Sequence, residues 1–150
     1  MSFVQKCDPL WSVIPEIEKK RIMAQEYCEL DYQFLGFTEV YIALSSIIPK
    51  HYTIIDFGCY LAAQCYAFSG HKRYIGVDVV DMERFSLPNT EHYVMSIQQY
   101  IKEHKDDNQV DTTFAICSYV PDNEATEMVR NNYKNVFVYY PAGTHLTLDM

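Results

Sequence analysis

The sequence has few of the features that define several common functional classes. It carries 12 Lys and Arg residues against 20 Asp and Glu, which gives a net charge of -8. Binding nucleic acid through its phosphates requires a clustered basic face, but the only basic clusters are 19–21 and 71–73. No apolar run approaches the length of a membrane span, and residues 1–10 are too polar for a secretory signal. Nucleic-acid and membrane partners are therefore not expected.

Cysteine and histidine occur without the spacing that disulfides or metal sites need. The five cysteines are odd in number and contain no C-x-x-C pair, and the five histidines show no i,i+4 pairing. A disulfide framework, a zinc ribbon and any other metal site are therefore not predicted. We expect free thiols, which are typical of a cytoplasmic protein.

The sequence does contain enough apolar material for one globular domain. At 150 residues, of which 49% are apolar, the chain is long enough to bury a single core. We expect one domain over residues 1–150, with a helical cover at 1–48 and a sheet core at 49–150. The 13 Tyr and 8 Phe residues can serve a core, an interface or a ligand platform, and composition does not choose among these.

The N-terminal region is predicted to be helical. Apolar residues recur at helical spacing after Pro15, and a proline suits a first helical turn. Gly36 is expected to divide the region into two helices, of which the second, 38–48, ends before Pro49.

From residue 52 onward, strand-like and helix-like segments alternate. The predicted strands are residues 53–57, 73–78, 91–95, 112–118 and 135–140, and the predicted helices are 60–69, 96–105 and 123–133. Residues 81–89 are predicted to form a loop with one helical turn at 82–85. This alternation favours an α/β fold in which a parallel sheet is joined by crossover helices.

Residues 53–80 contain the most informative pattern. The order of residues predicts strand, tight turn, helix, strand, with Asp56 and Gly58 in the turn and Asp78 at the end of the second strand. In an open parallel sheet, nucleotide-like ligands bind at the carboxyl ends of the strands, where such an acid can accept hydrogen bonds from ribose hydroxyls. A D-x-G turn alone also fits any α/β sheet, with the acid capping the next helix.

This segment resembles the cofactor-binding half of the Rossmann-like S-adenosylmethionine-dependent methyltransferases, on Asp56-Phe57-Gly58 and Gly76-Val77-Asp78. The resemblance implies about five mostly parallel strands in the order 3-2-1-4-5, with flanking helices and a helical N-terminal cover that often closes over the cofactor. It implies S-adenosylmethionine as the cofactor, with Gly58 against its methionine portion and Asp78 on its ribose.

Further candidate cofactor contacts follow from the resemblance: Asp56, Cys59 and Tyr60 around the turn, Ser96 after the third strand, and Cys117 and Ser118 at the end of the fourth. The serine after the third strand equally fits an ordinary helix N-cap. A buried free cysteine commonly behaves as a small hydrophobic residue, so both thiols also fit the core.

The methyl-acceptor residues of the family follow the fourth strand. Tyr119 and Asp122 lie there and are candidates for a catalytic base, although Asp122 equally fits the N-cap of the helix at 123–133. Methyl transfer depends mainly on in-line positioning, so an obligatory catalytic residue need not be present.

Two departures from the family pattern leave alternatives open. Tyr60 and Ala62 stand where the family turn has further glycines, and only residues 141–150 follow the fifth predicted strand. The first hypothesis is a methyltransferase that acts on a small molecule or a protein. The alternative is a non-catalytic protein of the same fold that binds, regulates or inhibits a partner through its acidic surface. A third is binding of a different nucleoside or dinucleotide.

The fifth predicted strand would form an exposed apolar edge of the sheet. It is exposed unless residues 141–150 fold back over it or another chain covers it, and exposed edges promote association. This edge motivates a homodimer as a hypothesis.

Overall fold

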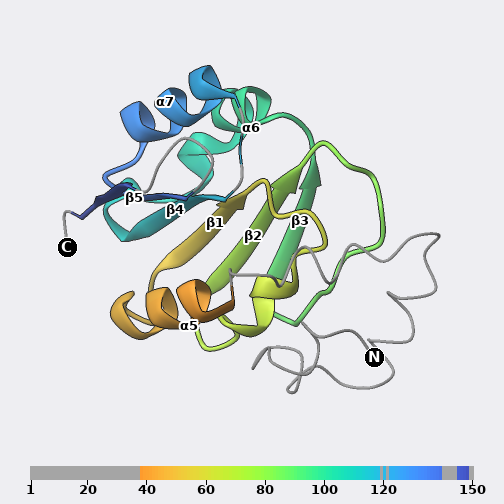
Figure 1. Cartoon of the computed structure of the whole chain (residues 1–150), viewed down its shortest axis with the longest axis vertical. Coiled ribbons are helices and arrows are strands. Elements are labelled where there is room, and N and C mark those ends of the chain that lie inside the picture. Colours follow the sequence, from red (N-terminus) through yellow and green to blue (C-terminus); the bar gives the residue numbers. More distant parts are fainter. Residues whose placement is uncertain (1–37, 119, 121, 140–144, 149–150) are drawn as a thin grey trace.

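The computed structural model describes residues 38–118, 120, 122–139 and 145–148, and these form a single sheet covered by helices (Figure 1). The sheet has six strands in the order β3-β2-β1-β4-β5-β6. The strands are β1 (Thr53–Phe57), β2 (Arg73–Asp78), β3 (Thr90–Val94), β4 (Thr113–Ser118), β5 (Asn135–Tyr139) and β6 (His145–Thr147). Strands β1 to β5 run parallel, and β6 pairs antiparallel with β5.

This topology confirms the predicted fold class: the chain has a Rossmann-like α/β fold, with the order 3-2-1-4-5 for its parallel strands. All five residues of β1 are buried, as expected for a central strand covered on both faces. The predicted strands agree with β1 to β5 to within one residue at each end, except that residue 140 lies outside the described residues.

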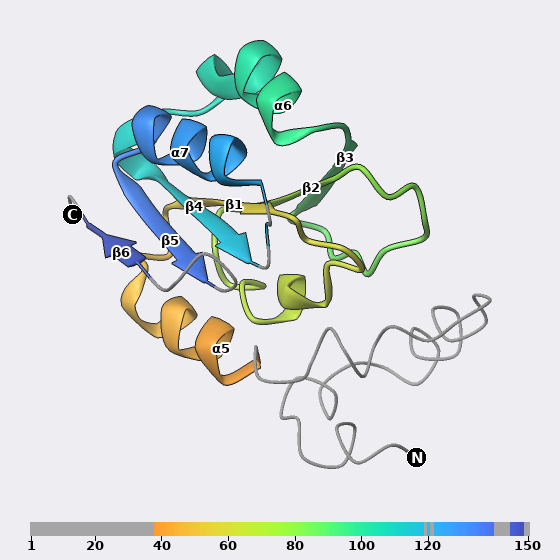
Figure 2. The same ribbon diagram turned by 45° about the horizontal axis from the view of Figure 1, so that its top comes forward.

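Helices cover both faces of the sheet (Figure 2). They are α5 (Thr38–Ile47), α6 (Ile97–His104) and α7 (Asn123–Asn132), with short 3-10 helices η1 (Ala63–Tyr66), η2 (Lys105–Asp107) and η3 (Val110–Thr112). One core cluster joins α5 and η1 to the sheet, and a second joins α6 and α7 to the opposite face. Because side chains alternate along a strand, Ile54 belongs to the first cluster and Ile55 to the second.

The starts of α6 and α7 are fixed by side-chain caps. Ser96 Oγ accepts a hydrogen bond of 3.1 Å from the N–H of Gln99, and Asp122 Oδ1 accepts from the N–H groups of Glu124 and Ala125. Both N-cap interpretations are therefore confirmed. The helix predicted at 38–48 is also confirmed as α5, whereas the helices predicted before residue 38 lie outside the described residues.

Two local predictions are wrong. Residues 60–69 contain only the single 3-10 turn η1, because Tyr60 and Ala62 have φ of 51° and 59°, outside the right-handed helical region. Residues 82–85 form no helical turn; the side chain of Arg84 is buried there instead and bonds to the carbonyl oxygens of Gly76 and Tyr93.

Strand β6 was not predicted. It pairs with Val136, Phe137 and Val138, so residues 145–147 cover the edge of β5 whose exposure motivated the homodimer hypothesis. This is the fold-back alternative, and dimerisation itself stays a prediction. Within the described part of the chain, no helix is both long enough and apolar enough to cross a membrane.

Candidate functional site

The turn after β1 has an unusual backbone conformation. Gly58, Tyr60 and Ala62 all have positive φ, at 78°, 51° and 59°. These are the alternate positions at which the resemblance expects glycine. A left-handed conformation costs a non-glycine residue about 1–2 kcal/mol. The turn therefore keeps a glycine-like backbone at two residues that do not favour it.

Hydrogen bonds to β2 hold this turn in place. The N–H groups of Gly58 and Cys59 donate to the carbonyl oxygen of Val77, at 2.8 and 3.3 Å. The N–H of Tyr60 donates to Asp78 Oδ2 at 2.9 Å. The ring of Tyr60 is half-buried and packs against the core cluster on the α5 face. The end of β2 thus compensates for the strain in the turn.

Asp78 lies at the carboxyl end of β2 and is half-buried. Its Oδ1 accepts a hydrogen bond of 3.0 Å from the N–H of Val80. Each carboxylate oxygen has two acceptor sites, so Asp78 retains capacity for a ligand. Its neighbour in sequence, Val79, is 65% exposed, and its partner in the sheet, Val94, is 50% exposed. A carboxylate beside exposed apolar side chains suits a ligand with both hydroxyls and an apolar ring.

Asp56 is not at the surface of the site, so the prediction that it contacts the cofactor directly is wrong. It is fully buried, and its Oδ2 accepts hydrogen bonds from Tyr74 Oη at 2.5 Å and from Gln64 Nε2 at 3.1 Å. Its Oδ1 has no hydrogen-bond partner. Burial raises the pKa of Asp56 from 3.8 to about 7, although the hydrogen bond from Tyr74 opposes this shift. Asp56 therefore neither caps a helix nor reaches the turn's outer surface; it joins β1 to β2 and η1.

Arg84 is a structural residue of the site that the sequence did not indicate. Its side chain is buried, and its guanidinium donates to the carbonyl oxygens of Gly76, Asp78, Val80 and Tyr93, at 3.1 to 3.3 Å. It thereby holds the loop after β2 against the ends of two strands. No motif or spacing marks this residue, because its partners are backbone atoms that only the fold brings together.

The two cysteines of the predicted site lie on opposite faces of the sheet. Cys59 belongs to the core cluster on the α5 face and Cys117 to the cluster under α6 and α7. Both are fully buried, and burial raises the pKa of Cys59 well above its usual range and that of Cys117 to about 12. These thiols behave as core residues, and they form no thiolate pair.

The remaining candidates lie at or after the carboxyl ends of β3 and β4. Ser96 and Asp122 are the helix caps described above, and Asp122 also accepts a hydrogen bond from Gln98. The hydrogen bond from the N–H of Ala125 is the main cause that lowers the pKa of Asp122, which makes this carboxylate a weak base. Ser118 ends β4, and Tyr119 lies outside the described residues.

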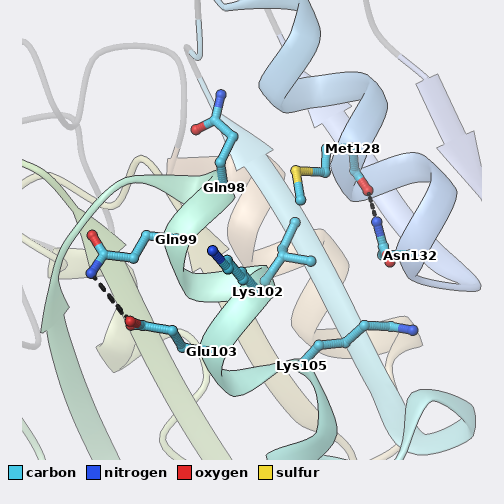
Figure 3. A pocket seen from close by; sticks show the side chains of 8 residues that line it. Gln98, Gln99, Lys102, Glu103, Lys105, Met128 and Asn132 are labelled. Atoms are coloured by element: carbon cyan, nitrogen blue, oxygen red, sulfur yellow. Dashed lines mark hydrogen bonds between the residues drawn. The ribbon is translucent and has the colours of Figure 1, made fainter.

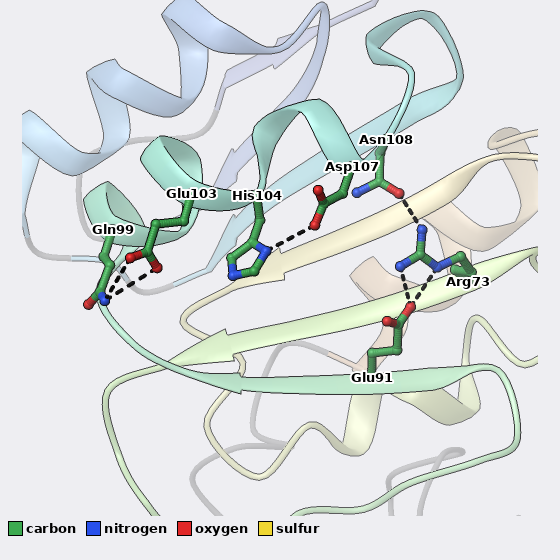
Figure 4. A network of polar contacts seen from close by, with 7 residues as sticks. All are labelled: Arg73, Glu91, Gln99, Glu103, His104, Asp107 and Asn108. Carbon is green, nitrogen blue, oxygen red and sulfur yellow. Dashed lines mark hydrogen bonds and ion pairs between the residues drawn. The ribbon is translucent and has the colours of Figure 1, made fainter.

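Other polar groups gather away from this edge. At the start of β2, Arg73 pairs with Glu91 and Asn108, and on α6 and η2 His104 contacts Asp107 (Figure 4). Because Arg73 begins β2 and Asp78 ends it, the Arg73 cluster lies at the amino ends of the strands, opposite the candidate site. No group of His, Cys, Asp and Glu residues in the described ranges could hold a metal ion.

A shallow groove of about 810 Å³ lies between α6 and α7 (Figure 3). Lys102 and Lys105 come from one side and Met128 and Asn132 from the other. Its polar side chains are partly bonded to one another, as Gln99 is to Glu103. The groove has the character of an ordinary interhelical surface.

Comparisons with known proteins add one distant likeness. No family model matches the sequence, and no curated protein is significantly similar to it. Among solved structures, the chain is similar to one named "putative type II methyltransferase" from Anaeromyxobacter dehalogenans, with a TM-score of 0.49 and 14% sequence identity. The match covers 69% of this chain and 47% of that one, so the chain spans about half of that protein's length. A likeness at this level carries no conclusion about activity.

Proposed function

We propose that the protein is an S-adenosylmethionine-dependent methyltransferase that acts on a small molecule or a protein, with the cofactor at the carboxyl ends of β1 and β2. The observation that carries the proposal is the strained turn at 58–62, tied to the carboxylate of Asp78. Backbone strain persists only where the surrounding structure enforces it, and it is concentrated at ligand-binding sites.

The residues present fit the nucleoside half of the cofactor. Asp78 offers free acceptor capacity for ribose hydroxyls, and the exposed Val79 and Val94 offer apolar contact for a base. Gly58 has φ of 78° and no side chain, which permits close approach of the ligand to the end of β1. Together these residues favour binding of an adenosine group.

When bound, S-adenosylmethionine supplies an activated methyl group on a sulfonium sulfur. The part of the chain described here would orient that group through Asp78 and the backbone of the turn, since in-line methyl transfer depends mainly on positioning. A hydroxyl acceptor would also need a base for its proton. Asp122 is held as a helix cap with a lowered pKa, so the proposal assigns no base to it.

A specific observation also supports the alternative of a non-catalytic binding protein. The N–H groups of Gly58, Cys59, Tyr60 and Ala62 all donate hydrogen bonds within the protein, so these four are already satisfied without a ligand. The net charge of -8 would favour a basic partner in that case.

Isothermal titration calorimetry with S-adenosylmethionine and S-adenosylhomocysteine tests the proposal. We expect the wild type to bind both and Asp78→Asn to bind about tenfold or more weakly, because charge-assisted hydrogen bonds are lost. Asp81→Asn is the matched control: it removes the same charge from an exposed residue in the adjacent loop. No heat from folded wild-type protein up to millimolar ligand would favour the non-catalytic alternative. Binding of adenosine or a dinucleotide, with no binding of either methionine-derived ligand, would favour the hypothesis of a different nucleoside or dinucleotide ligand.

A further inference from the structure

Two acidic residues lie close together at the end of the sheet, and only one of them reaches the surface. Parallel pairing of β1 with β2 places Asp56 beside Gly76, and Asp78 follows on the same face of β2. Gly76 has no side chain, and the nearest atom to the position of a Cβ there is Cys59 Sγ, at 2.9 Å. Asp56 is therefore enclosed directly behind the half-buried Asp78 and the turn.

The charge state of Asp56 depends on the groups that face it from each neighbouring element. Asp78 of β2 disfavours a second negative charge, and Arg84 of the following loop favours one. The hydroxyl of Tyr74 and the amide of Gln64 donate to Oδ2, and the thiols of Cys59 and Cys117 are both close enough to feel its charge. Oδ1 is buried without a partner. Burial outweighs the other effects, so the carboxyl is close to balance between its neutral and ionised forms near neutral pH.

Because neither form of Asp56 strongly predominates near neutral pH, a new charge in its low-dielectric surroundings changes the fraction of Asp56 that is ionised. A cation bound at the turn would favour the ionised form of Asp56, and a neutral ligand of the same shape would not. Thermodynamic linkage makes this reciprocal, so the site binds the cation more tightly when Asp56 is ionised than when Asp56 is neutral, and a neutral ligand gains no such preference.

We propose that Asp56 makes the site selective for the charge of its ligand: when a sulfonium ligand binds at the turn, Asp56 releases a proton to solvent, and the uncharged thioether counterpart causes no such release. The inference rests on the proposed function. Binding then converts a neutral carboxyl and a free cation into a carboxylate beside a bound cation, with one proton released. On methyl transfer, a lone pair of the acceptor would form the new bond to the methyl carbon, and the S–C bond would break with its electron pair left on sulfur. The sulfur would then be a neutral thioether, Asp56 would take a proton from solvent, and the product would lose the attraction that the ionised carboxyl gave to the cofactor.

The test measures protons. Calorimetric titrations at about pH 7 in two buffers of different ionisation enthalpy give the number of protons released with S-adenosylmethionine and with S-adenosylhomocysteine. We expect the sulfonium ligand to release up to about half a proton more than the thioether. Asp56→Asn should abolish this difference, because its carboxamide has nearly the shape of the carboxyl but cannot ionise. The affinity ratio of the two ligands should also rise several-fold between about pH 6 and about pH 8 in the wild type and stay constant in Asp56→Asn.

A second variant keeps the test decisive if Asp56→Asn does not fold. Tyr74→Phe removes a hydrogen bond that favours the ionised carboxyl, so the pH of maximal proton release should move upward. Equal proton release with both ligands, or a difference that survives in Asp56→Asn, would overturn this inference and leave the proposed function standing. Absence of binding by either ligand would overturn the proposed function and the inference with it.

Discussion

The backbone N–H of Tyr60 donates a 2.9 Å hydrogen bond to Oδ2 of Asp78, which ties the turn after β1 to the end of β2. This bond explains how a tyrosine keeps φ of 51° where the resemblance expects a glycine. The acid that is proposed to bind ribose therefore also has a structural role that exists without any ligand.

Loss of the Asp78 carboxylate should destabilise the free protein. Asp78→Ala removes the acceptor of the Tyr60 and Val80 N–H groups, and we expect the free energy of unfolding to fall by about 1–3 kcal/mol. Asp81→Ala, in the exposed loop nearby, should change it by less than about 0.5 kcal/mol. Urea unfolding measures both. Equal effects would show that the carboxylate does not support the turn.

Glycine should be tolerated at 62 but not at 63. Both alanines are buried, so each substitution loses about the same methyl burial of roughly 0.8 kcal/mol. At Ala62, with φ of 59°, relief of left-handed strain should offset that loss and leave stability nearly unchanged. At Ala63, in η1, added backbone freedom should increase the loss to about 1–2 kcal/mol. Thermal unfolding of the pair checks the prediction, and indistinguishable variants would contradict it.

Gly76 should not accept a side chain. A Cβ there would lie 2.9 Å from Cys59 Sγ and 3.3 Å from His92 Nδ1, so Gly76→Ala should cost about 1–3 kcal/mol. The cost should shrink in a Cys59→Ala background, which a double-mutant cycle measures as coupling. Gly70→Ala is the control, since no atom lies closer than 3.8 Å to its Cβ position. A Gly76→Ala protein as stable as the Gly70→Ala protein would refute the steric argument.

The stability of the protein should depend on the ionisation of Asp56. Its pKa is raised from 3.8 to about 7 by burial, so between these values the folded state holds a proton that the unfolded state has lost. The stabilising contribution is complete below about pH 4 and is lost as pH rises through about 7, by at most about 4 kcal/mol.

The comparison with Asp56→Asn isolates this contribution from that of the other acids. The stability advantage of the wild type over the variant should be smallest at about pH 8. At that pH the wild type holds a buried carboxylate, whereas the variant keeps a neutral side chain. The matched control Asp111→Asn removes an exposed carboxylate paired with Lys134, and it should change the free energy of unfolding by less than about 1 kcal/mol. A pH-independent difference for Asp56→Asn would contradict the raised pKa.

Arg84 should not be replaceable by lysine. A single ammonium cannot reach the carbonyl oxygens of Gly76, Val80 and Tyr93 together, so Arg84→Lys should cost about 3 kcal/mol. Arg130→Lys, which affects one exposed ion pair with Glu127, should cost less than about 0.5 kcal/mol. Chemical denaturation of the two variants gives the comparison. Similar midpoints would show that the hydrogen bonds of Arg84 do not hold the loop after β2.

Local sequence was sufficient for the strands and the caps. Buried strands are continuous apolar runs, and a serine or aspartate before a polar helix is a local signal. For this reason the N-cap was one of the two interpretations given for Ser96 and for Asp122, and the structure confirms it. Strand β6 was missed because the three residues of His145–Thr147 are too few for a periodic pattern and depend on pairing with β5.

The site was predicted only in part. Gly58 and Asp78 were correctly placed at neighbouring strand ends, because the order of a strand, a turn and a second strand is enough to do so. The inward position of Asp56 was not predicted, since its partners Tyr74 and Gln64 come from two other elements. The helix predicted at 60–69 failed for the same reason, because contacts with β2 override local preference.

By itself, the sequence determined the α/β class, the five parallel strands and the acid at the end of β2, because apolar periodicity and short-range turns are written in consecutive residues. Only the tertiary structure decided that Tyr60 and Ala62 take left-handed angles, that Asp56 is buried and close to balance between two charge states, and that Arg84 joins two strands. These properties depend on hydrogen bonds and burial between residues far apart in the chain, and such energies exist only once the sheet has formed.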